Sequence, residues 1–154
     1  MSATSSQALL EVAADRAAVA AILDARGRHR EAQERMRQAL WVFESVLGPA
    51  HYEVAMTLDK LAAIANRAGD SAQAVALYER AVGIKRRVLG SDHADVAVTL
   101  SDLGALHLSA GRFGEAEAAL SRAVAILERG SERSHPSLAS CRENRELARA
   151  RRRR

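Results

Sequence analysis

Two copies of one pattern decide the fold: Val54-Ala55-Met56-Thr57-Leu58 and Val96-Ala97-Val98-Thr99-Leu100 lie 42 residues apart. Gly27, Gly69 and Gly111 recur at the same offset. Other positions repeat with them, namely Ala32, Ala74 and Ala116, then Ala39, Ala81 and Ala123, then His51, His93 and His135. A fixed period of roughly 20 to 50 residues is typical of solenoids, in which each unit buries its apolar face against its neighbours. The sequence therefore predicts a repeat architecture.

Each repeat is predicted to be a pair of helices. Leu58, Leu61, Ala62 and Ala65 follow the i, i+3, i+4, i+7 spacing of one helix face, and Gly69 suits the left-handed residue that ends a helix. Similar stripes are Leu100, Leu103, Gly104 and His107; Ala74, Leu77, Tyr78, Ala81, Ile84 and Val88; and Ala116, Ala119, Leu120, Ala123 and Ile126. We expect helices near residues 6–26, 29–47, 51–68, 71–89, 93–110, 113–129 and 136–151.

The composition supports an all-α protein of one domain. The chain has 154 residues and 48% hydrophobic residues, but only 3% aromatic residues, 2 prolines and 9 glycines, while alanine occurs 33 times. This balance favours helices and argues against sandwiches and barrels. We expect a single domain over residues 1–150, with repeats at about 8–48, 51–90 and 93–130, a capping helix at 136–150 and a basic tail at 151–154.

The positive charge is concentrated at the carboxyl end. The net charge is +4, yet residues 139–154 hold seven arginines and two glutamates, so the rest of the chain is nearly neutral. Any affinity for nucleic acid or another polyanion would belong to this end, through Arg151, Arg152, Arg153 and Arg154. A solvated tail without a ligand is the alternative, because aromatic residues are not interleaved with these charges.

The sequence points to a cytoplasmic protein. Cys141 is the single cysteine, so no disulfide can form within the chain. The first residues lack a basic stretch typical of secretory signals, and the longest apolar run, residues 17–23, is far shorter than the roughly 20 residues of a membrane span. We therefore expect no membrane association.

Neither a metal site nor an active site is expected. His51, His93 and His135 occupy equivalent positions in successive repeats, so they cannot converge on one ion; hydrogen bonds to helix ends are the better interpretation. Phosphate-binding loops, nucleophile elbows and zinc-protease motifs are absent from the sequence. Cys141 has no convincing base, and Glu115 and Glu117 suit a helix start without any chemistry. We therefore predict a protein that is not an enzyme and holds no cofactor.

Taken together, these motifs resemble tetratricopeptide repeats of the 42-residue, kinesin-light-chain type. The resemblance covers residues 12 to 140 and rests on the Val-Ala-x-Thr-Leu-x-x-Leu-Ala/Gly string at 54–62 and 96–104. The Gly-x-x-x-x-Ala turn at 69–74 and the Leu-Gly-x-x-His exit at 47–51 and their later copies belong to it as well. It implies a right-handed superhelical solenoid of three antiparallel hairpins and a capping helix, whose first helices line a concave groove.

The resemblance also implies a function, that of a scaffold which holds a peptide segment or a partner helix in this groove. The candidate contacts lie opposite the buried stripes: Met56, Asp59, Lys60, Ala63, Asn66 and Arg67, then Val98, Ser101, Asp102, Ala105, Leu108 and Ser109. The family's paired asparagines after Thr-Leu are replaced by Asp59-Lys60 and Ser101-Asp102. Val98 and Leu108 favour a ligand, because apolar residues on an open face would otherwise be uncovered. A solvated face without ligand is the alternative.

The alanine-rich helix near the amino end shows apolar residues on every side, from Ala13 to Leu23. This pattern is typical of a helix covered on more than one side, so we expect stacking on a second copy or a partner. A solvent-exposed helix rich in alanine is the alternative. A further alternative role is that of a sensor or assembly module, because similar repeats often form the carboxyl-terminal part of larger signalling ATPases. This sequence has no nucleotide-binding motif, so the ATPase would be a separate chain.

Overall fold

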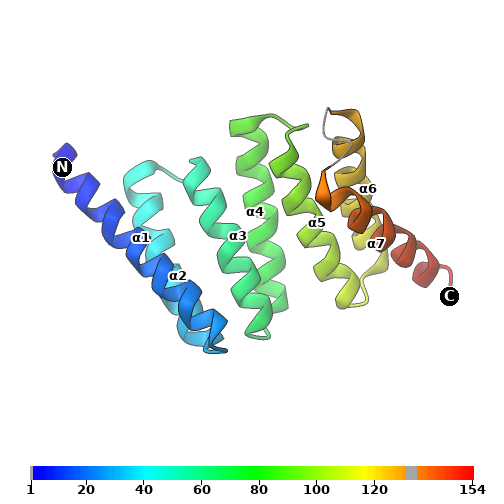
Figure 1. Ribbon diagram of the computed structural model, residues 1–154, viewed down its shortest axis with the longest axis horizontal. Helices are drawn as coiled ribbons and strands as arrows, with labels where there is room; N and C mark the ends of the chain where they lie inside the picture. The colour runs from blue at the N-terminus through cyan, green and yellow to red at the C-terminus, as the bar shows by residue number, and fades with distance from the viewer. Residues whose placement is uncertain (1, 131–134) are drawn as a thin grey trace. The chain divides into compact units, whose positions relative to one another are not determined.

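The computed structural model describes residues 2–130 and 135–154, which form helices without any strand in that part of the chain (Figure 1). The helices are α1 (Ala3–Ala25), α2 (His29–Leu47), α3 (Tyr52–Arg67), α4 (Ser71–Leu89), α5 (Ala94–Ser109), α6 (Phe113–Arg129) and α7 (Pro136–Arg152). The predicted boundaries agree to within about three residues, and the all-α fold class is confirmed.

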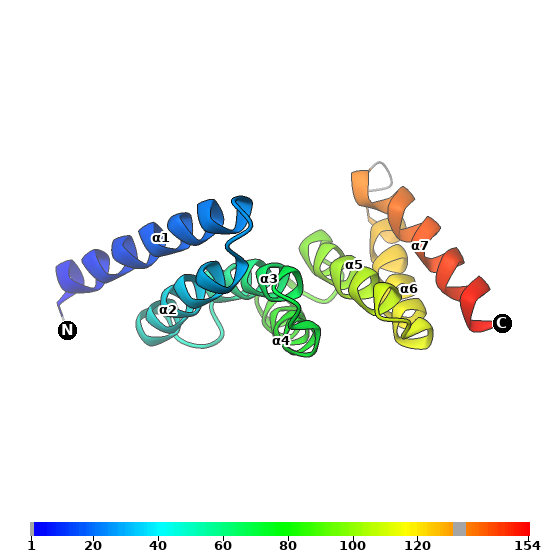
Figure 2. The ribbon, with the colours of Figure 1, turned by 90° about the horizontal axis from the view of Figure 1, so that it is seen from below.

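The chain forms two compact units, Met1–Ile84 and Lys85–Arg154, and the boundary between them falls inside α4. In the first unit α2 packs against α1 on one side and α3 on the other. In the second unit α6 packs against α5 and α7 (Figure 2). Each unit is thus a small stack of helices with its own buried residues.

The predicted stripes form the cores of these units. Leu58, Leu61, Ala62 and Ala65 of α3 are at most 1% exposed, and they share the first unit with buried Met36 and other residues of α1, α2 and α4. Their counterparts on α5, namely Leu100, Leu103, Gly104 and His107, are buried as well. Val88 is an exception, since it is exposed. Near the carboxyl end of α4, Lys85 is buried although it carries a charge. Its Nζ donates a hydrogen bond to the Thr99 hydroxyl at 2.9 Å.

The recurring glycines end the first helix of each hairpin. Gly69 has φ of +86°, a left-handed conformation that residues with a Cβ rarely adopt. It allows Asp70 N–H to donate a hydrogen bond back to the Ala65 carbonyl at 2.8 Å, which satisfies a carbonyl that the end of the helix would leave unpaired. The same bond recurs after Gly27 and Gly111. The glycines predicted from the period therefore set the sharp turn between paired helices.

The recurring histidines begin the first helix of the later hairpins and the last helix. The Nδ1 atom of His51 accepts the Glu53 N–H at 3.0 Å, that of His93 accepts the Asp95 N–H at 3.0 Å, and that of His135 accepts the Ser137 N–H at 3.1 Å. Each ring thereby satisfies a donor in the first turn of α3, α5 or α7. The interpretation of these histidines as groups that bind helix ends is confirmed.

Candidate peptide-binding surface

The predicted groove residues of the first unit all lie on α3. Lys60, Asn66 and Arg67 are exposed, while Met56, Asp59 and Ala63 are half-buried. They lie beside the fully buried stripe of the same helix, so α3 presents a mixed surface of small apolar and charged side chains.

Three of these residues line a hollow of about 190 Å³. Lys60, Ala63 and Arg67 form one wall together with Ile64, and Ala21, Asp24 and Met36 complete it from α1 and α2. Its apolar lining comes from Ala21, Met36, Ala63 and Ile64, and its charged groups are Lys60, Asp24 and Arg67. A hollow of this size and lining can take up one apolar side chain of a bound segment, with polar groups of the segment near the charges.

Asp24 and Arg67 are joined across this hollow. Arg67 donates through Nε to Asp24 Oδ1 at 3.1 Å and forms a second hydrogen bond through Nη2 to Oδ2. His29 Nδ1 lies 2.7 Å from Asp24 Oδ1. The bonds from Arg67 hold the pKa of the Asp24 carboxyl below its ordinary value; partial burial opposes them, and His29 adds to the lowering. Arg67, predicted as a ligand contact, is thus already engaged within the chain.

Asp24 and Ala21 line this hollow too, although they were not among the residues predicted from the sequence. The signal was present, because the 42-residue offset relates Ala21 to Ala63 and Asp24 to Asn66. The same reasoning that placed Ala63 and Asn66 on the open side of α3 places Ala21 and Asp24 on that side of α1.

The predicted residues of the second unit lie on α5. Asp102 and Ser109 are exposed, and Val98, Ser101, Ala105 and Leu108 are half-buried. The Ser109 hydroxyl donates to the Ala105 carbonyl of its own helix at 3.0 Å. The Cys141 thiol of α7 donates to the Ser101 hydroxyl at 3.1 Å, and Cys141 itself is fully buried. Ser101 therefore faces α7.

Leu108 is covered by neighbouring helices, contrary to the prediction that it lies on an open face. Leu108 packs against the buried residues Ala116, Leu120 and Ala148 of α6 and α7. Its apolar character is therefore satisfied inside the chain, because the last helix covers this part of α5, and it gives no reason to expect a ligand. Val98, which is half-buried, keeps the predicted position beside the buried stripe.

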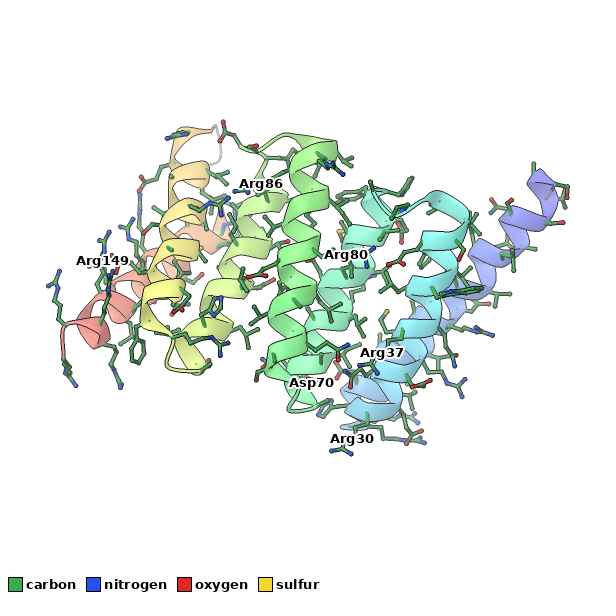
Figure 3. The ribbon with its side chains drawn as sticks, turned by 180° about the vertical axis from the view of Figure 1, so that it is seen from behind. Arg30, Arg37, Asp70, Arg80, Arg86 and Arg149 are labelled. Atoms are coloured by element: carbon green, nitrogen blue, oxygen red, sulfur yellow. The ribbon has the colours of Figure 1, made fainter. Side chains whose placement is uncertain are left out.

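The carboxyl-terminal arginines divide into two groups. Arg149 and Arg152 of α7 both bind Glu117 of α6, at 3.0 and 3.2 Å, and their hydrogen bonds lower the pKa of the Glu117 carboxyl (Figure 3 labels Arg149). Arg151, Arg153 and Arg154 are exposed. Arg152 thus helps to attach the last helix, although its side chain is 64% exposed, and Arg151, Arg153 and Arg154 are the other exposed cations of the tail.

No group of three or more histidine, cysteine or acidic side chains suited to a metal ion occurs among residues 2–130 and 135–154. Over the same residues, no helix is both long and apolar enough to span a bilayer.

A chain of helical hairpins with glycine turns at one period defines a helical-repeat protein. The tetratricopeptide repeat model matches residues 10–87 and 53–129, and this chain belongs to that family. No curated protein matches the sequence.

Solved structures show the same fold. BtubC (BKLC) from P. vanneervenii has a TM-score of 0.82 and 23% identity, over 90% of this chain and 56% of that one. A putative kinesin light chain from Podosopora anserina, with nearly identical TPR-like repeats, has a TM-score of 0.77 and 24% identity, over 90% of this chain and 65% of that one. The chain thus spans between about half and two thirds of the length of these relatives. The resemblance to kinesin-light-chain-like repeats is confirmed at the level of the fold.

Proposed function

We propose that this chain is a non-catalytic scaffold that holds a peptide segment of a partner protein against the first helices of its hairpins. The observation that carries the proposal is the hollow between α1, α2 and α3, which three of the predicted contacts line. Tetratricopeptide repeats serve in general as protein-interaction scaffolds, which supports the same function. The preferred segment has an apolar side chain for the hollow and an acidic group near Lys60, which is an exposed residue.

A matched pair of variants tests this proposal. Ala63→Glu places a carboxylate in the hollow, whereas Ala76→Glu makes the same change at an exposed alanine of α4 that does not line it. Peptides would be selected from a displayed random library on the wild-type chain and then titrated against all three proteins. We expect Ala63→Glu to weaken binding at least about tenfold and Ala76→Glu to leave it unchanged. Equal affinity of the peptides for all three proteins would mean that the hollow is not the binding site.

The tail supports a second candidate, association with a polyanion through Arg151, Arg153 and Arg154. A variant with glutamine at these three positions separates the candidates, because it leaves Arg149, Arg152 and the packing of α7 intact. Loss of a strongly salt-dependent affinity for nucleic acid in this variant would support the tail. An unchanged affinity for nucleic acid in this variant would exclude binding through the tail. The association with a separate ATPase and the cytoplasmic location stay predictions.

The exposed apolar residues of α1 favour self-association of the chain. Leu9, Val12, Val19 and Ile22 are uncovered in the first unit, and we propose that the chain associates with a second copy of itself through this helix.

A further inference from the structure

One side of α1 is apolar, exposed and centred on two opposite charges. Leu9, Val12, Val19 and Ile22 are between 40% and 53% exposed, although each is a large hydrophobic residue. Val12 and Val19 line a hollow of about 300 Å³ together with Asp15, Arg16 and Arg35 of α2. α2 packs against α1 (Figure 2), and Ala13 and Ala20 are the fully buried residues of α1 in the core of the first unit. The exposed side is therefore distinct from the side that faces the core.

The residues on this side are arranged symmetrically about the midpoint between Asp15 and Arg16. Val12 and Val19 lie equally far from that midpoint, and so do Leu9 and Ile22. Val12, Asp15, Val19 and Ile22 also follow the alternating three and four spacing of a helix–helix seam. If a second copy of α1 runs antiparallel to the first, each apolar residue meets an apolar residue and each Asp15 meets the Arg16 of the second copy.

We propose that two copies of this chain associate about a two-fold axis that passes between Asp15 and Arg16, with their α1 helices antiparallel. This arrangement rests on the self-association proposed above and specifies its geometry. A two-fold interface is self-complementary, so that residue i contacts residue j and residue j contacts residue i. The reversal symmetry of α1 meets this requirement, whereas an unrelated partner would need the apolar residues but not their symmetrical placement.

Charge and length support this assignment. Asp15 and Arg16 line the hollow beside Arg35, and within residues 2–130 and 135–154 their side chains take part in no ion pair or hydrogen bond. Both charges are therefore available to a second copy, which would form two Asp–Arg pairs at the centre of the seam. The helices would overlap over residues 6–25, about 30 Å at the rise of an α-helix. Each pair would be flanked by Val12 and Val19, and Leu9 and Ile22 would pack toward the two ends.

Variants with reversed charge at positions 15 and 16, alone and mixed with each other, test the antiparallel arrangement of the two α1 helices. Asp15→Arg places two cations at the centre of each helix, and Arg16→Asp places two anions there, so each variant alone would oppose like charges. An equimolar mixture of the two variants restores both attractive pairs, and the double variant Asp15→Arg/Arg16→Asp restores them within one chain. Glu79→Arg, at an exposed position of α4, is the control for the change in net charge. Circular dichroism checks that the helix content of each variant is unchanged.

Sedimentation velocity over roughly a hundredfold range of concentration provides the measurement. We expect the mass of the wild-type chain and of Glu79→Arg to rise from 16.6 kDa toward twice that value. Each single reversal should weaken association at least about tenfold, and the mixture and the double variant should recover it. A wild-type chain that stays monomeric would overturn self-association altogether. Association that the single reversals do not weaken, or that the mixture does not recover, would overturn the two-fold geometry alone.

Discussion

Arg67 shows how a single residue can change its role between the sequence and the folded chain. Its position on the open side of α3 makes it a candidate ligand contact, but in the structure its guanidinium group binds the carboxylate of Asp24 through two hydrogen bonds. The side chain of Asp24 is only 13% exposed, whereas that of Arg67 is 49% exposed. The main role of Arg67 is therefore to hold Asp24 in the wall of the hollow. Only the exposed part of its side chain is available to a ligand.

This pair predicts a pH dependence. Because the pKa of Asp24 is lowered in the folded chain, the unfolded state binds more protons, and the contribution to stability is present above the ordinary value of about 3.9. It is lost as the pH falls through the lowered pKa. We expect Asp24→Asn to reduce the free energy of unfolding by about 1 kcal/mol at pH 7, and the difference from wild type to shrink in acid.

Urea unfolding of both proteins at neutral pH and in acid measures this difference. Asp92→Asn is the control, because the side chains of Asp92 and its partner Arg129 are both 73% exposed and lie 3.9 Å apart. A difference for Asp24→Asn that is equally large in acid would contradict an ionic origin.

At the scale of the element, the close approach of α5 and α6 depends on Gly104. A Cβ added to Gly104 would lie 2.5 Å from Cγ of Leu120, a branch carbon in a fully buried side chain. Leu120 cannot retreat without moving the core of the second unit. The small residue predicted at this place in the stripe is therefore required by packing.

Two glycine substitutions give opposite results if this explanation is correct. Gly104→Ala should lower the free energy of unfolding by about 1–3 kcal/mol because of overpacking. Gly83→Ala lies within α4 with no atom within 4 Å of the added Cβ, so it should raise stability by about 0.5–1 kcal/mol through backbone entropy. Thermal and urea unfolding of both variants check the prediction. A gain in stability for Gly104→Ala would mean that α5 and α6 separate easily.

At the scale of the whole molecule, the chain consists of two compact units, each with its own core. In repeat proteins each unit contacts mainly its neighbours in sequence, so stability is distributed locally. Met36 is buried in the first unit, and Leu120 is buried in the second.

This organisation predicts that damage stays local. Met36→Ala and Leu120→Ala should each remove about 2–5 kcal/mol of packing energy. Hydrogen exchange should show that Met36→Ala lowers protection mostly in residues 1–84, and that Leu120→Ala lowers it mostly in residues 85–154. Equal loss of protection along the whole chain for either variant would indicate that the two units unfold as one.

The sequence by itself determined the helices, their ends and their pairing. Periodicity identified Gly69 and its equivalents as turn residues and Leu58 with its neighbours as core, because these properties depend on interactions between residues close in the chain. The capping role of His51 follows from the same local geometry. The 42-residue offset also relates Asp24 to Asn66, so the repeat pattern contains the position of Asp24 beside the hollow.

Only the tertiary structure decided which side chains near the candidate surface have partners. Arg67 pairs with Asp24, α7 covers Leu108 and Ser101, and Arg152 binds Glu117. These contacts join residues that are between 35 and 43 positions apart. Helical spacing tells on which face of its own helix a side chain lies, but not which side chain of the next helix meets it. That depends on the distance between packed helices, which small residues such as Gly104 set.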